Sequence, residues 1–292
     1  MNPIESKVLG KQISHPREYA PEILVAVPRQ LNRAQYDIHE QSLPFIGVDA
    51  WHAYELGFLT QRGLPVAGIL KMVYACDNKF LVESKSLKLY LNSFNMGKYG
   101  VNRKEGIELV LKTIKTDLTK LLQTEVELAF HTQYEHHSYD FNDYILLEDE
   151  QEADTVAFDV YREDKNLLTS IKANELQEIK VSTNLLRSNC KITRQPDWGS
   201  AFIHIKSKHH IDKIDLLKYL VSIRDENHFH EEICEMLYKR LLDKFEPEVL
   251  MVACLYTRRG GIDICPVRAN KREHLPPNII QSELLTMQAF RQ

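Results

Sequence analysis

Apolar positions in the first half of the chain follow strand spacing, then helix spacing, then strand spacing again. Two extended runs, at residues 66–76 and 80–91, are separated by a short turn and predict two strands. Apolar residues then recur at helical spacing and predict a helix capped by Asn102, with Glu105 three residues later. Residues 126–130 alternate as a strand does.

The second half repeats this order of elements. Its pattern predicts strands at 181–188 and 201–206, helices at 211–223 and from His230 to before Pro247, and strands at 249–256 and 262–267. Two strands, a helical segment and further strands, occurring twice, predict a duplicated α+β module.

Two segments lie outside this repeat. Residues 1–64 are rich in Pro, Gly and polar residues, which predicts an irregular N-terminal arm with one or two strands that packs on the first module. The acidic stretch 148–154 is typical of a solvated linker. We therefore expect an arm plus first module over residues 1–150 and a second module over residues 151–292.

Composition narrows the class of protein. Of 292 residues, 43% are hydrophobic and 27% charged, which is ordinary for a globular protein. The net charge of -4 gives no basic field to attract nucleic acid, and no apolar run is long enough to span a membrane. An N-terminus without a long apolar stretch and five irregularly spaced cysteines favour a reduced, cytoplasmic protein.

Cys190 is the strongest candidate for chemistry. Three cations, Arg187, Lys191 and Arg194, flank it within four residues, and the first carboxylate after it is Asp197. Nearby cations favour the thiolate, which is the nucleophilic form. The turn residues that follow predict a loop. A cationic loop thiol with an acid seven residues on indicates covalent catalysis with a proton donor.

Three further segments carry candidate chemistry. On a strand, residues 82–90 would put charges and leucines on one face, as in a polar site or a solvated edge. Glu231, near a helix start, could accept two hydrogen bonds from a guanine-like edge or simply favour the helix dipole. Residues 257–261, TRRGG, suit a phosphate site or an ordinary hairpin.

Two clusters of metal-ligating residue types occur in the sequence. Cys190, His230 and Cys234 would supply three zinc ligands and leave one position open for water. The cluster His131, His136 and His137 has no diagnostic metal spacing. The dinucleotide fingerprint G-x-G-x-x-G does not occur, so a bound dinucleotide would not use the Rossmann device.

Together the motifs ESKSLKLY (83–90), SNCKITRQPDWG (188–199), FHEE (229–232) and TRRGG (257–261) resemble the NADPH-dependent 7-cyano-7-deazaguanine reductases, the nitrile reductases of queuosine biosynthesis. The match is to the long, two-module form. The resemblance implies the tunnelling fold, with two tandem ββααββ modules of antiparallel sheet and a site at a module interface. It also implies a homodimer. Cys265 departs from the asparagine expected in that position.

The resemblance also implies roles for named residues. Cys190 would attack the nitrile carbon to give a thioimide, Asp197 would protonate the nitrogen, and His230 would assist later proton transfer. Burial beside Trp198 would raise the pKa of Asp197. Glu83 and Glu231 would hold the deazaguanine, with Val82, Ser84 and His230 beside it. Ser84, Lys85, Arg259 and Gly260 would contact NADPH. No resident metal is expected.

Because Glu83 and Cys190 lie in different halves, we expect either half alone to be inactive. One alternative is a zinc-dependent cyclohydrolase or pterin-type enzyme on the same fold. Another is a purine-binding module without catalysis.

Overall fold

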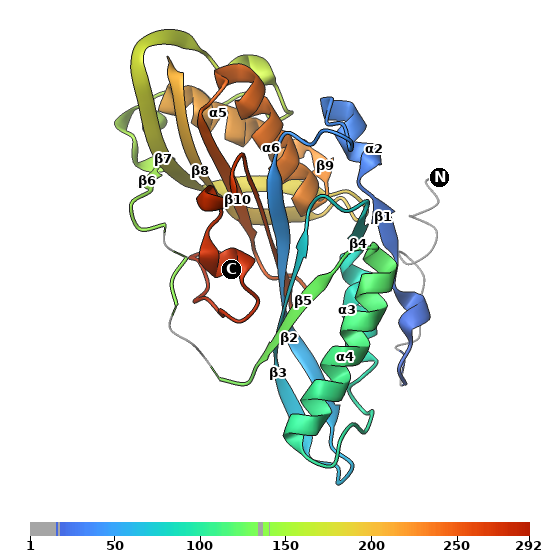
Figure 1. Ribbon diagram of the computed structural model, residues 1–292. Coiled ribbons are helices and arrows are strands. Elements are labelled where there is room, and N and C mark those ends of the chain that lie inside the picture. The colour runs from blue at the N-terminus through green and yellow to red at the C-terminus, as the bar shows by residue number, and fades with distance from the viewer. Residues whose placement is uncertain (1–15, 17, 134–136, 140) are drawn as a thin grey trace.

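The computed structural model describes residues 16, 18–133, 137–139 and 141–292. Its frame is a nine-stranded sheet in the order β5-β3-β2-β11-β10-β8-β7-β6, with β9 beside β7 (Figure 1). The strands are β2 (Ile46–Leu59), β3 (Pro65–Ala75), β5 (Val126–His131), β6 (Ile145–Leu146), β7 (Ile171–Cys190), β8 (Pro196–His210), β9 (Asn227–His228), β10 (Val249–Tyr256) and β11 (Ile262–Ala269). A separate two-stranded sheet pairs β1 (Ala26–Pro28) with β4 (Phe80–Val82).

The longer helices cover one face of the large sheet, and the short C-terminal helix packs on the other face (Figure 1). The helices are α2 (Gln30–Arg33), α3 (Ser84–Asn92), α4 (Arg103–Leu122), α5 (Lys213–Ser222), α6 (His230–Phe245) and α7 (Pro277–Ile280). Strand pairing is antiparallel except where β7 meets β6 and β9. The fold class is therefore α+β with mainly antiparallel sheet, as predicted. Among the helices of the described residues, none is long and apolar enough to cross a membrane.

The two halves of the chain share this sheet. β2 and β11 pair antiparallel from Ala53 opposite Ile262 to Ile46 opposite Ala269. Alternation along β11 sends its side chains to different cores: Ile264 packs with α3 and α4, whereas Cys265 lies on the opposite face, under the C-terminal segment. Because a first-half strand forms a ladder with a second-half strand, side chains from both halves are held at fixed separation.

The predicted strand over residues 80–91 is wrong. β4 ends at Val82, and α3 begins at Ser84. The cause is a helix cap: Glu83 has extended backbone, and its carboxylate accepts hydrogen bonds from the backbone N–H groups of Lys85 (3.0 Å) and Ser86 (2.7 Å). Charges and leucines alternate in this stretch because it is helical, with its apolar face buried against the sheet.

Most other elements agree with the sequence pattern. The strands β3, β5, β10 and β11 and the helices α5 and α6 begin and end within about three residues of the predicted limits, which is the usual uncertainty of helix and strand ends. The Asn102 side chain accepts a hydrogen bond from the backbone N–H of Glu105 at 3.1 Å, as the capping pattern predicted. β7 and β8 are much longer than expected, because their outer halves carry polar residues that the apolar pattern does not mark.

The N-terminal region is more closely integrated into the fold than the irregular arm that we predicted. One or two strands were predicted there; the region holds two, β1 and β2, and β2 lies in the middle of the large sheet. Tyr36, Ile38 and Phe45 join the core beneath α6, so this region packs on the second half as well as the first. Residues 1–15 and 17 lie outside the described residues.

The acidic stretch 148–154 lies against the second half instead of forming a free linker. Leu147 is buried in the second-half core, and Glu148 accepts a hydrogen bond from the backbone N–H of Asn184 at 2.7 Å. Glu150 forms an ion pair with Lys213. Much of the stretch is nevertheless exposed. A division at residue 150 remains a prediction.

Candidate active site

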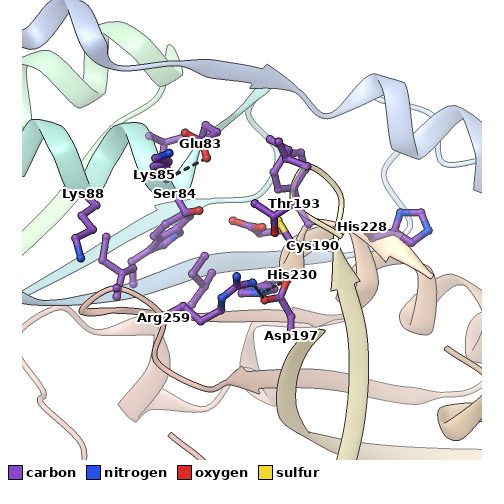
Figure 2. A pocket seen from close by; sticks show the side chains of 18 residues that line it. Glu83, Ser84, Lys85, Lys88, Cys190, Thr193, Asp197, His228, His230 and Arg259 are labelled. Atoms are coloured by element: carbon purple, nitrogen blue, oxygen red, sulfur yellow. Dashed lines mark hydrogen bonds and ion pairs between the residues drawn. The ribbon is translucent and has the colours of Figure 1, made fainter. Parts of the chain in front are cut away.

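A pocket forms where the β4–α3 junction faces the β7–β8 hairpin, the first turn of α6 and the β10–β11 hairpin (Figure 2). It is a half-open cleft of about 230 Å³, lined by both apolar and polar side chains as small-molecule sites are. All ten residues proposed from the sequence line it: Val82, Glu83, Ser84, Lys85, Cys190, Asp197, His230, Glu231, Arg259 and Gly260. The pocket is therefore assembled from both halves of the chain.

Cys190 is the last residue of β7 and is half-buried. The turn after it is closed by two backbone hydrogen bonds, from Arg194 N–H to the Cys190 carbonyl (2.9 Å) and from Cys190 N–H to the Gln195 carbonyl (2.8 Å). The thiol therefore stands at a rigid strand end, with the predicted loop reduced to the residues that follow it. Two flanking cations are engaged elsewhere, since Lys191 pairs with Glu232 and Arg187 donates to the carbonyl of Arg224.

Asp197, at the start of β8, is buried between two basic side chains. Its carboxylate forms an ion pair with Arg259 and lies 3.4 Å from Nε2 of His230. Burial alone raises the pKa of Asp197, but His230 and Arg259 outweigh it and hold that pKa below its ordinary value. The predicted raised pKa is therefore wrong for this structure, and Asp197 is a carboxylate.

His230 begins α6 and is held by ring stacking. Its imidazole lies flat on the ring of Tyr256, with centroids 3.8 Å apart and planes 7° apart. Tyr256 faces Gly199 across the β8–β10 pairing. A Cβ at Gly199 would lie 2.8 Å from the Leu255 carbonyl oxygen and 3.2 Å from the Tyr256 ring. The glycine of the PDWG motif thus leaves room for the ring on which His230 rests.

Replacing Gly199 by alanine is expected to destabilise the protein by about 1–3 kcal/mol, because backbone must move to accommodate the methyl group. The His230 ring should shift with Tyr256. Urea unfolding would measure the stability, and Ala201→Gly, a change of the same size in the same strand, is the control for strand propensity. A Gly199→Ala variant that is as stable as the wild type would show that the contact is not tight.

Glu231 presents an unsatisfied acceptor to the pocket. Among the described residues, its buried Oε1 has no hydrogen-bond partner. Burial, followed by the nearby carboxylate of Asp49, raises the pKa of Glu231 to about 8. A polar atom buried without a partner is costly, and a ligand that donates hydrogen bonds would remove the cost. Glu83, across the pocket, uses both oxygens to cap α3, but each oxygen keeps a second lone pair for a ligand.

A buried ion cluster supports the helix turn behind Glu231. Glu235, one turn further along α6, is bound by both Arg33 (2.8 Å to each oxygen) and Arg268 (2.9 Å). Burial raises the pKa of Glu235, but Arg268 and Arg33 outweigh it and hold the pKa at about 2. Arg29 adds a third cation. The N-terminal region therefore helps to fix the helix that carries Glu231.

Part of the pocket lining is cationic. Lys85, Lys88 and Arg259 line it together with Gly260. Gly260 and Gly261 have φ of 58° and 78°, and a Cβ at Gly260 would lie 3.0 Å from Nζ of Lys88. Cations around a glycine turn fit the phosphates of a dinucleotide. Lys88 was missed because the strand reading sent it to the face opposite Lys85, whereas residues three apart share a helix face.

The predicted zinc ligands do not come together. Cys234 is fully buried beneath the pocket, and its thiol donates to the carbonyl oxygens of Val252 (3.5 Å) and Pro266 (3.6 Å). Its thiol is therefore turned away from Cys190 and His230. Of the histidine cluster, His136 lies outside the described residues, and Nε2 of His131 lies 3.0 Å from the Ser282 carbonyl oxygen.

One other group of ligand-type residues is buried on the far face of the sheet: His52, Asp263 and Cys265. Asp263 already accepts hydrogen bonds from His52 (2.7 Å) and Tyr54 (2.7 Å). The buried ammonium group of Lys71 donates hydrogen bonds to the carbonyl oxygens of Asn278 (2.8 Å) and Leu284 (2.7 Å), and its charge attracts that of Asp263. These contacts satisfy the Asp263 carboxylate, whereas the buried Nε2 of His52 has no hydrogen-bond partner among the described residues.

Both halves of the chain match known families. Residues 15–130 match the family model described as "Nitrile reductase, 7-cyano-7-deazaguanine-reductase N-term", and residues 196–274 match "QueF-like protein". Proteins named NADPH-dependent 7-cyano-7-deazaguanine reductase from Colwellia psychrerythraea and Dechloromonas aromatica are each 37% identical to this chain. These alignments cover 92% and 95% of this chain and 93% and 95% of those proteins. A protein of the same name from Coxiella burnetii is 37% identical over 266 residues.

A pocket with a strand-end thiol, a buried acid and a cationic glycine turn, on a chain with these matches, defines the class of nitrile reductases. The chain belongs to the NADPH-dependent 7-cyano-7-deazaguanine reductase family, in its long form.

Proposed function

We propose that this chain reduces the nitrile of 7-cyano-7-deazaguanine to the primary amine, 7-aminomethyl-7-deazaguanine, with NADPH, in queuosine biosynthesis. The observation that carries the proposal is the convergence of Cys190, Asp197 and Glu231 on one pocket beside a cationic glycine turn. Each has a separate task in nitrile reduction. The zinc-dependent alternative has no support, because its three ligands are not assembled among the described residues.

Addition of the thiol to the nitrile needs no outside proton. Asp197 is a carboxylate, so it can take the proton from the Cys190 thiol as sulfur bonds to the nitrile carbon. It then passes that proton to the nitrile nitrogen. One C–S bond and one N–H bond form, one S–H bond and one π bond break, and the product is a thioimide. Asp197 is thus first a base and then an acid.

Two reductions follow at the same carbon. NADPH, when bound, supplies the hydride for each of them. His230, in contact with Asp197, is placed to hold the proton that nitrogen gains in each reduction. Between the two, the C–S bond breaks and sulfur returns to Cys190, leaving an imine. The nitrile group thereby gains four hydrogen atoms in all, delivered as two hydrides and two protons.

Binding roles follow from the two ends of the pocket. Glu231 and Glu83 would accept hydrogen bonds from the deazaguanine edge, with Val82, Ser84 and His230 beside the ring. Lys85, Arg259 and Gly260 would hold the cofactor phosphates with Ser84 nearby, and Lys88 joins them in our proposal. Trp51 and Ile264 contribute apolar lining to the pocket.

The proposal also covers the arrangement of modules and the oligomeric state. The order β2-β3-α3-α4-β5 and its counterpart β7-β8-α5-α6-β10-β11 support two tandem tunnelling-fold modules, although only one strand follows the helices in the first. The family resemblance supports a homodimer. A cytoplasmic location and the lack of a nucleic-acid partner stay predictions.

The proposal is tested by turnover with its stoichiometry. Purified protein supplied with 7-cyano-7-deazaguanine should oxidise two molecules of NADPH for each amine formed, measured by absorbance and by chromatography of the product. One NADPH per nitrile, or a dependence on added zinc that chelation abolishes, would contradict the proposal. Purine without the nitrile should cause no NADPH oxidation, which separates catalysis from simple purine binding.

A further inference from the structure

One side chain belongs to both the cofactor end and the catalytic end of the pocket. Arg259 stands on the β10–β11 hairpin next to Gly260, where cofactor phosphates are proposed to lie. Both terminal nitrogens of its guanidinium group contact other side chains. One terminal nitrogen forms the ion pair with Asp197, and the other donates to the Gln195 side chain at 2.9 Å. Figure 2 shows Arg259 reaching across the pocket floor to Asp197.

We propose that Arg259 is a positioning residue that couples cofactor binding to the charge of Asp197: phosphate at the hairpin draws the guanidinium charge away from the acid, and Asp197 then keeps its proton more readily. The inference rests on the proposed function and gives Arg259 a task beyond binding the cofactor. The side chain is suited to it, because 37% of it is exposed while that of Asp197 is almost wholly buried.

The sign of the effect does not depend on how the phosphate is bound. If Arg259 leaves Asp197, the acid loses an attractive cation. If Arg259 contacts both, the phosphate still brings negative charge toward the acid. Either change favours the neutral carboxylic acid. The pKa of Asp197 in the structure is already held down by His230 and Arg259 together, so weakening one of them raises it.

Arg259 is the charged neighbour of Asp197 whose contacts a bound phosphate can change. His230 approaches from α6 and is fixed by its stack on Tyr256, which is buried on β10. Cys190 lies at the end of β7 and Glu231 on α6, both lining the same pocket. Lys85 comes from α3, where it lines the cofactor end of the pocket. Of the three basic residues named here, His230, Lys85 and Arg259, only Arg259 both pairs with Asp197 and lies on the glycine-containing β10–β11 hairpin.

The coupling would serve the order of the reaction. Thiol addition uses Asp197 as a base, so the acid should be ionised while the nitrile is attacked. The reductions that follow need a proton at nitrogen, so the pair of Asp197 and His230 should then hold its proton. A change in the contacts of Arg259 between these stages would leave Asp197 ionised during thiol addition and favour its protonation during the reductions. No atom is gained or lost in the switch itself.

The test is the pH dependence of adduct formation, which occurs without turnover. The rate at which intact protein gains the mass of 7-cyano-7-deazaguanine would be followed from pH 5 to 8.5, at saturating nitrile, with and without NADP⁺. NADP⁺ carries the phosphates but donates no hydride. At low pH the rate should fall as Asp197 becomes protonated, and we call this fall the acid limb. In the wild type, saturating NADP⁺ should move the acid limb to higher pH by about one unit or more, since an adjacent arginine commonly lowers an aspartate pKa by one to three units.

Three variants assign the effect. Arg259→Gln should place the acid limb at higher pH even without NADP⁺, and NADP⁺ should move it less. Arg258→Gln removes the same charge from the same hairpin, but its guanidinium lies over the Tyr54 ring at 3.4 Å, so the limb should stay at the wild-type position. Asp197→Asn should have no such limb.

The outcomes are distinct. An unmoved limb in the wild type at saturating NADP⁺, or coincident profiles for Arg259→Gln and Arg258→Gln, would overturn the coupling while leaving nitrile reduction intact. Absence of any adduct in the wild type at every pH would instead refute the proposed function.

Discussion

Replacing Cys190 by alanine is expected to abolish nitrile reduction. Without sulfur no thioimide forms, and the nitrile must accept hydride directly. Loss of an enzyme nucleophile commonly costs several orders of magnitude in rate, so turnover should fall by at least about 10⁴-fold. NADPH oxidation in the presence of 7-cyano-7-deazaguanine measures the loss.

The fold and the binding site should survive this change, because Cys190 is half-buried and its turn hydrogen bonds, one donated and one accepted, are made by its backbone. Quenching of tryptophan fluorescence should therefore still report binding of the heterocycle, since Trp51 lines the pocket. Cys265→Asn is the matched control: it removes a buried thiol on the far face of the sheet and should retain turnover. Substantial turnover by Cys190→Ala would refute covalent catalysis.

Replacing Glu231 by glutamine is expected to weaken binding of the heterocycle by about 10–100-fold. Two ligand N–H groups need two acceptors, and the amide offers one acceptor and an unwanted donor. A mispaired buried hydrogen bond costs about 1–3 kcal/mol. Fluorescence titration in the Cys190→Ala background measures affinity without covalent chemistry.

The same substitution has a characteristic pH signature. The carboxylate form of Glu231 is the acceptor, and its pKa is raised to about 8 by burial and by Asp49. Affinity in the parent should therefore increase as pH rises from 6 to 8, as the free carboxyl group ionises. Glu231→Gln should remove this dependence. Glu232→Gln, one residue along and paired with Lys191, should keep it. A pH dependence that persists in Glu231→Gln would assign the recognition to another group.

Much of the site could be predicted because its chemistry is local in sequence. Cys190 and Asp197 belong to one hairpin, and Arg259 and Gly260 to another, so short motifs preserve their relation. The helix over 84–92 could not be distinguished from a strand by apolar spacing in so short a run. Recognising Glu83 as a helix cap would have corrected the assignment and brought Lys88 beside Lys85.

The charge of Asp197 could not be predicted for a different reason. Its sequence neighbour Trp198 suggested an apolar setting, but the residues that decide its pKa, His230 and Arg259, come from distant parts of the chain. The same holds for the ion cluster behind Glu231, where Arg33 meets Glu235 from 202 residues away. Long-range pairs of this kind appear only when the strands are placed in order.

The mass of the intact protein after incubation with 7-cyano-7-deazaguanine, with no NADPH present, tests the central claim most directly. We predict a gain of one substrate mass in the wild type and none in Cys190→Ala. An unmodified wild-type protein at saturating substrate, or the same adduct on the alanine variant, would contradict a thioimide at Cys190.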